Sequence, residues 1–69
     1  MKLDYCAIGM RIKERRMKKE WSQEMLASTV GISNPHMSNI DRGKTKVSLA
    51  TLIDIANALD MTLDALICD

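Results

Sequence analysis

Residues 23–42 decide the fold, and they read QEMLASTVGISNPHMSNIDR. Their apolar side chains fall at positions 26, 30, 32, 37 and 40, and the small Ala27 lies four residues before Gly31. Two helices that cross at a steep angle need a small side chain where they touch, and the tight turn between them needs a residue that tolerates positive φ. The stretch therefore predicts a helix-turn-helix unit whose two helices share one apolar core.

Apolar residues recur at helical spacing in the rest of the chain as well. Leu3, Ile8 and Ile12 mark one stripe of a helix over about residues 5–19, and two further apolar sets follow within residues 49–67. Four of the expected helices begin after a residue that caps helix N-termini well: Ser22, Ser33, Ser48 and Thr62. We therefore expect five short helices with tight connections.

Length and composition set bounds on this fold. The 69 residues suffice for one small domain, residues 1–69, and are too few for a large enclosed active site. Hydrophobic residues make up 46% of the chain, which suits a globular domain, and three Gly and one Pro are too few for a turn-rich β fold. The sequence predicts an all-α domain in which residues 49–67 complete the core.

Charge is distributed unevenly along the chain. Residues 1–46 hold all ten Lys and Arg and five acids, giving +5, whereas residues 47–69 hold four acids and no base, giving −4. A basic front and an acidic rear make the protein dipolar, and the basic side favours a polyanionic partner.

Several classes of function lack the residues that they need. One His and two distant cysteines, Cys6 and Cys68, do not form a zinc set, and no nucleophile–base pair is evident, so we expect neither an enzyme nor a cofactor. The chain has no signal-peptide pattern and no apolar stretch near the roughly 20 residues of a membrane span. We expect a cytoplasmic protein with two free thiols and no membrane association.

Five segments together resemble one known family. They are IGMRIKE (8–14), SQEMLA (22–27), VGIS (30–33), SNIDRG (38–43) and SLATLIDIANAL (48–59). In these segments the chain is similar to the phage-repressor/Cro-type (XRE) helix-turn-helix family, over roughly residues 8–67. The resemblance implies a compact five-helix, repressor-type DNA-binding domain. It also implies a transcriptional regulator, usually a repressor, that binds the major groove of double-stranded operator DNA as a homodimer.

The resemblance assigns roles to individual residues. Those expected to contact bases lie on the exposed side of the second motif helix: Asn34, Pro35, His36 and Asn39. Those expected to contact DNA phosphates are Gln23, Ser33, Ser38, Arg42, Lys44 and Lys46. Arg16 and Asp41 match a family ion pair that bridges the first and third helices. Because no charged residue lies between Met25 and Ile40, the helix lacks the Arg or Lys that most often reads guanine, and we expect an A/T-leaning site.

Three positions depart from the family pattern. Glu20 and Asp60 stand where the family often has Gly at a helix end, which costs about 1 kcal/mol each if φ is positive. Arg15 stands where an apolar residue is common, and we expect its stem to cover the core while its head stays in water.

Association with other chains is also expected. An apolar set near the acidic end would form a dimer surface away from the basic side: Ile55, Leu59, Leu63, Leu66 and Ile67. The uncharged second motif helix leaves an alternative open, in which the fold serves as a protein-interaction module, such as an antitoxin whose main partner is a toxin. The family includes such members.

Overall fold

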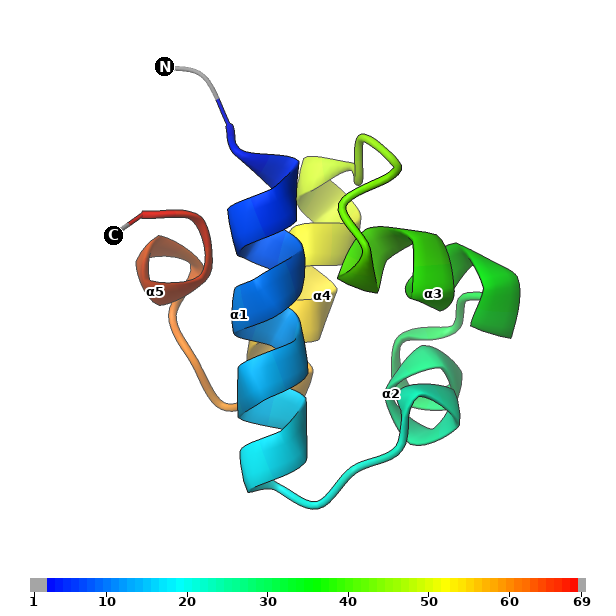
Figure 1. Ribbon diagram of the computed structural model, residues 1–69. Coiled ribbons are helices and arrows are strands. Elements are labelled where there is room, and N and C mark those ends of the chain that lie inside the picture. Colours follow the sequence, from blue (N-terminus) through cyan, green and yellow to red (C-terminus); the bar gives the residue numbers. More distant parts are fainter. Residues whose placement is uncertain (1–2, 69) are drawn as a thin grey trace.

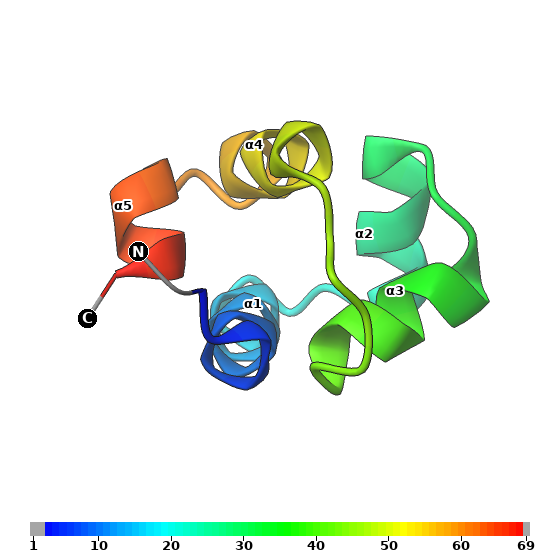
Figure 2. The same cartoon turned by 90° about the horizontal axis from the view of Figure 1, so that it is seen from above.

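The computed structural model describes residues 3–68, which form five helices and contain no strand within that range (Figure 1). The helices are α1 (Tyr5–Lys18), α2 (Gln23–Val30), α3 (Asn34–Asp41), α4 (Leu49–Ala58) and α5 (Leu63–Ile67). α1 and α4 lie in the middle of the molecule, with α5 at one end and α2 and α3 at the other (Figure 2). The predicted all-α fold is confirmed.

Each helix begins where a side-chain oxygen accepts a backbone N–H of the first turn. The four predicted caps, Ser22, Ser33, Ser48 and Thr62, each accept the N–H three residues later at 3.0–3.2 Å. α1 is capped by Asp4, whose Oδ1 accepts from Cys6 and Ala7 at 3.1 Å, a cap that the sequence analysis did not assign. Helices this short are not stable alone, so caps and tertiary packing together define them.

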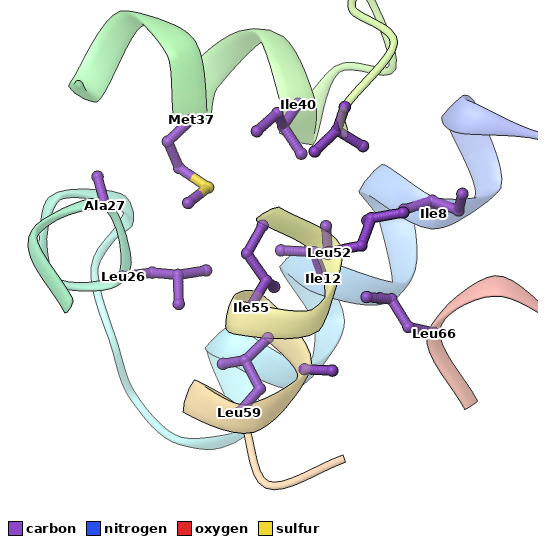
Figure 3. Packing of buried hydrophobic residues seen from close by; sticks show 12 residues of the cluster. Ile8, Ile12, Leu26, Ala27, Met37, Ile40, Leu52, Ile55, Leu59 and Leu66 are labelled. Atoms are coloured by element: carbon purple, nitrogen blue, oxygen red, sulfur yellow. The ribbon is translucent and has the colours of Figure 1, made fainter. Parts of the chain in front are cut away.

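One buried core joins the five helices (Figure 3). Its large, fully buried side chains are Ile8, Ile12, Leu26, Met37, Ile40, Leu52, Ile55, Leu59 and Leu66. Burial of apolar surface is the main stabilising contribution to a domain of this size, at about 25 cal/mol per Å². Since Met37 and Ile40 fix α3 on this core, the opposite side of α3 faces outward.

Part of the expected dimer surface lies inside the monomer. Ile55, Leu59 and Leu66 are 0% exposed, so the expectation that they form a surface for a second copy is wrong. Leu63 and Ile67 are partly buried and pack against the core from α5. A core this small needs the whole apolar face of α4, and helical spacing alone does not distinguish a core face from a surface patch.

α1 approaches the last turn of α3 closely at Gly9. A Cβ atom at this position would lie 2.5 Å from the carbonyl oxygens of both Ile40 and Asp41. Backbone atoms held in a helix cannot move aside as a flexible side chain can. The position of α3 relative to α1 therefore depends on the absence of a side chain at residue 9.

Two arginines of α1 bind the ends of the C-terminal helices. Arg15 donates from Nε to the Leu59 carbonyl at 2.9 Å and from Nη2 to the Asp60 carbonyl at 3.1 Å. Arg11 donates from Nη1 to the Leu66 carbonyl at 3.0 Å. These guanidinium groups satisfy helix-end carbonyls and complement the negative ends of the helix dipoles. Arg15 stays partly exposed, and its head also caps the end of α4, a role that was not predicted from the sequence.

Glu20 and Asp60 have φ of 59° and 55°, so the expected left-handed positions are present. We expect Glu20→Gly to raise the free energy of unfolding by about 1 kcal/mol, because glycine adopts positive φ without steric cost. Urea unfolding monitored by circular dichroism measures the change.

Asp60→Gly is the matched control for that prediction. It relieves the same backbone strain but removes an exposed ion pair, in which Lys19 Nζ lies 2.6 Å from Asp60 Oδ2. The hydrogen bond and charge of Lys19 lower the pKa of the Asp60 carboxyl from its ordinary value of 3.8, so this exposed pair adds a small stabilisation at neutral pH that is lost as the pH falls through the lowered pKa. Asp60→Gly should therefore gain less than Glu20→Gly. A Glu20→Gly protein no more stable than the parent would refute the argument.

Candidate nucleic-acid interface

α2 and α3 are held at a fixed angle by the short turn between them. Gly31 ends α2 with φ of 76°, in the left-handed region that favours glycine, and its N–H donates to the Ala27 carbonyl. Ala27 is fully buried where the two helices meet, close to Met37 (Figure 3). The small side chain and the glycine therefore play the parts that the spacing of residues 23–42 predicted.

The outward side of α3 is polar. A helix turns by about 100° per residue, which places Pro35, Asn39 and Arg42 opposite the buried Met37 and Ile40. Pro35 and Asn39 lie together on this side, whereas Asn34 and His36 flank it, each about 100° from Pro35 in opposite directions round the helix. All four residues expected to contact bases are at least partly exposed: Asn34, Pro35, His36 and Asn39. Ser38 is also partly exposed on this helix. The outward side of α3 thus offers hydrogen-bonding groups and the apolar ring of Pro35.

Arg16 and Asp41 form the expected ion pair between α1 and α3. Arg16 Nη2 lies 3.2 Å from Asp41 Oδ2, and the two side chains are 10% and 5% exposed. Arg16 Nη1 also donates to the Trp21 carbonyl at 2.9 Å, in the turn before α2. This arginine therefore connects the end of α3 to α1 and to the start of the helix-turn-helix.

Two residues expected to contact phosphates already serve the fold. Gln23 donates from Nε2 to Asp41 Oδ2 at 2.8 Å, so it joins the Arg16–Asp41 pair, a bond that the sequence analysis did not foresee. Ser33 Oγ accepts the His36 N–H at 3.2 Å as the cap of α3. Each group keeps a further donor, the second amide N–H of Gln23 and the hydroxyl hydrogen of Ser33. Their structural bonds fix where those donors lie.

A cluster of cations follows the exposed end of α3. Arg42 is the C-cap of α3, and Lys44 and Lys46 are exposed on the loop that leads to α4. The acidic Asp54 and Asp64 lie exposed on α4 and α5, and α5 is at the far end of the molecule from α2 and α3 (Figure 2). The charge asymmetry seen along the sequence does not separate cleanly in space, because Arg11, Arg15 and Lys18 line a hollow with Ala65 of α5. Asp54 in turn lies beside Thr29 and Val30 of α2. The local cluster of cations after α3 is what would attract a polyanion to that loop.

One contact on this surface was not predicted from the sequence. Arg42 Nη2 donates to Asn39 Oδ1 at 3.1 Å. The bond joins Arg42, which is expected to contact a phosphate, to Asn39, which is expected to contact a base. The available signal was their spacing, because side chains three residues apart are neighbours on a helix.

Within residues 3–68, no group of three or more His, Cys, Asp or Glu side chains is arranged to hold a metal ion. Within the same range, no helix has the length and apolar character to cross a membrane.

Comparison with known proteins identifies the family. The helix-turn-helix family model HTH_3 matches residues 12–66. The chain belongs to this family. The restriction-modification controller protein C.AhdI from Aeromonas hydrophila has the same fold, with a TM-score of 0.86 and 35% identity, over 91% of this chain and 96% of that chain. The P22 c2 repressor, crystallised with a synthetic operator, gives a TM-score of 0.82 at 31% identity, over 97% of this chain and 96% of that chain.

Relatives found by sequence agree with this assignment. Control protein C.MunI from Mycoplasma sp is 36% identical over 62 residues, which cover 88% of this chain and 84% of that protein. The chain spans only 57%, 29% and 42% of three other relatives, which are two transcriptional regulators and a phage immunity repressor. These matches confirm that this HTH_3 member resembles phage-repressor and Cro-type proteins. That family consists of transcriptional regulators rather than enzymes.

Proposed function

We propose that this HTH_3 protein is a sequence-specific transcriptional repressor that binds the major groove of double-stranded DNA as a homodimer. The observation that carries the proposal is the outward side of α3, where polar side chains on a fixed helix are followed at once by exposed cations. An α-helix fits the major groove, where each base pair presents its own pattern of donors and acceptors. Two relatives, the P22 c2 repressor and the biofilm regulator SinR, were crystallised with DNA.

In this proposal the residues divide by the part of DNA that they reach. Base edges are contacted from α3 by Asn34, Pro35, His36 and Asn39. Backbone phosphates are contacted by Gln23, Ser33 and Ser38, through the donors that the fold leaves available, and by Arg42, Lys44 and Lys46. The phosphate contacts set affinity and orientation, and the base contacts set sequence preference.

The dimer surface needs residues other than the buried ones. Leu49 and Ile53 are 59% and 41% exposed and lie one turn apart on α4. Leu63 and Ile67 have the same spacing on α5, which packs beside α4, and both are partly exposed. We assign the dimer contact to these four residues. A two-fold dimer would place two copies of α3 about one DNA turn apart.

Selection of bound duplexes from a random DNA library at near-physiological salt tests the proposal. We expect an inverted repeat whose half-sites are about 10 base pairs apart, centre to centre. Enrichment of a single unrepeated site would refute the dimer, and no enriched sequence at all would refute sequence-specific binding.

A protein-interaction role is the second candidate. The exposed Leu49 and Ile53 favour it, because this apolar pair could equally be covered by a different protein. A relative, SinR, has been crystallised in complex with the protein SinI, at 33% identity and a TM-score of 0.81 over 86% of this chain. A protein that sediments as a monomer and selects no DNA sequence would favour a protein-interaction role, for example that of an antitoxin.

Lys44→Ala tests the phosphate contacts. Because an exposed lysine in the α3–α4 loop carries no sequence information, its loss should weaken binding to all duplexes by a similar factor. The slope of log K against log salt concentration should become shallower by about 2, since the dimer loses one phosphate contact in each half-site and releases two fewer counterions. Fluorescence anisotropy titrations at several salt concentrations measure both quantities.

Lys18→Ala supplies the control. Lys18 is also an exposed lysine, but it lies at the end of α1 and borders a surface hollow with Met61, which follows α4, and not the α3–α4 loop. This substitution should leave the salt slope nearly unchanged. Equal slopes for the Lys44→Ala protein and the parent would rule out the phosphate role of Lys44.

A further inference from the structure

Asn39 and Arg42 present their side chains as a hydrogen-bonded pair on the outward side of α3. Arg42 Nη2 lies 3.1 Å from Asn39 Oδ1. A guanidinium group has donors and no acceptor, so the Asn39 atom that faces it must be the carbonyl oxygen. The orientation of the Asn39 amide is therefore fixed, with its NH2 group pointing away from Arg42.

Arg42 belongs to the base-facing side of α3 as well as to its end. It follows Asn39 by three residues and Pro35 by seven, so the three side chains lie along one side of the helix. That side is opposite Met37 and Ile40, which are 0% and 2% exposed. Arg42 therefore lies beside Asn39, whereas Lys44 and Lys46 lie farther along the loop.

The hydrogen bond changes what Asn39 can read. Free asparagine pairs well with adenine, because it accepts from adenine N6 and donates to N7. The bond from Arg42 occupies one of the two lone pairs of Asn39 Oδ1, so the pair faces a base mainly with donors: the Nδ2 hydrogens of Asn39 and the remaining guanidinium hydrogens of Arg42. Guanine presents two acceptors, N7 and O6, whereas adenine presents one acceptor and one donor.

We propose that Asn39 and Arg42 act as one donor-rich reading unit that selects guanine over adenine at one base pair of each half-site. This inference rests on the proposed function and names the base that the site prefers. It replaces the expectation of an A/T-leaning site at that base pair, and it moves Arg42 from the phosphate contacts of the proposed function to a base contact. That expectation rested on the absence of charged residues between Met25 and Ile40, and it assigned Arg42 to the phosphate backbone.

The test compares the parent protein with Asn39→Ala, Arg42→Ala and Lys44→Ala. Each is titrated by fluorescence anisotropy against the selected operator and against duplexes in which each G·C pair of the half-site is replaced by A·T. The parent should prefer guanine at one position by at least about fivefold, and Asn39→Ala should lose that preference at the same position. Arg42→Ala frees Asn39 Oδ1, so its preference should move toward adenine. Lys44→Ala should weaken all duplexes and keep the guanine-to-adenine ratio.

The outcomes separate the inference from the proposed function. If Arg42→Ala lowers affinity but keeps the guanine preference, Arg42 is only a phosphate contact and the inference fails. It also fails if the parent prefers adenine at the position that Asn39→Ala disturbs. A parent protein with no sequence preference would refute the proposed function itself. Circular dichroism checks that the variants keep the parent helix content.

Discussion

Gly9→Ala is expected to destabilise the protein by about 3 kcal/mol or more. The new Cβ would lie 2.5 Å from the carbonyl oxygens of Ile40 and Asp41, so α1 and α3 would have to move apart. Separating them disturbs the core contacts of Ile8 and Ile40, and overpacking of this kind typically costs 1–3 kcal/mol, with larger values where backbone must shift. Urea unfolding measures the loss.

The sign of this effect is informative because glycine is a poor helix former. Without a close neighbour, alanine at a mid-helix position would stabilise the protein by 0.5–1 kcal/mol. Gly31→Ala provides the contrast, since a Cβ there meets nothing within 4 Å but φ is +76°. We expect it to cost only about 1 kcal/mol. A Gly9→Ala protein as stable as the parent would disprove the close approach of α1 to α3.

Asp41→Ala is expected to cost about 3 kcal/mol. It leaves the buried Arg16 guanidinium without its carboxylate and removes the acceptor of the Gln23 amide. Breaking one side of a buried ion pair typically costs 3–5 kcal/mol, mostly because the remaining charge is uncompensated. We expect a cost at the lower end of this range, because the ion pair is incompletely hydrogen-bonded. Arg16 Nε and Asp41 Oδ1 are buried and have no hydrogen-bond partner among the described residues.

A double variant distinguishes loss of the pair from loss of packing. Arg16→Met combined with Asp41→Leu removes both charges and should recover much of the stability lost in Asp41→Ala. Lys19→Ala breaks the exposed Lys19–Asp60 pair and should change stability little. If Asp41→Ala is no more harmful than Lys19→Ala, the Arg16–Asp41 pair does not hold α3 in place.

Local signals allowed most of the fold to be predicted from the sequence. A cap such as Ser33 acts on an N–H three residues away, and Gly31 acts on its own φ, so both can be identified without knowledge of the tertiary structure. The exposed side of α3 followed for the same reason. Once Met37 and Ile40 are assigned to the core, the helical period assigns the rest.

The partners of polar side chains were much less predictable. Gln23 and Asp41 are 18 residues apart, and Arg15 bonds to a carbonyl 44 residues away, so only tertiary packing brings them together. The error at the dimer surface has a similar origin. Ile55 and Ile53 are both apolar residues of one helix, yet the first is 0% and the second 41% exposed, because neighbouring helices cover only one side of α4.

The bonds from Arg11 and Arg15 to the ends of α5 and α4 also bear on how the chain folds during synthesis. They join the first helix of the chain to its last two, as do the contacts of Ile8 and Ile12 with the shared core. A ribosome adds roughly 5–20 residues per second, so α1 emerges seconds before its partners exist. The core cannot close until Leu66 has been made. We expect folding as a single unit at that point, with the apolar stripe of α1 exposed until then.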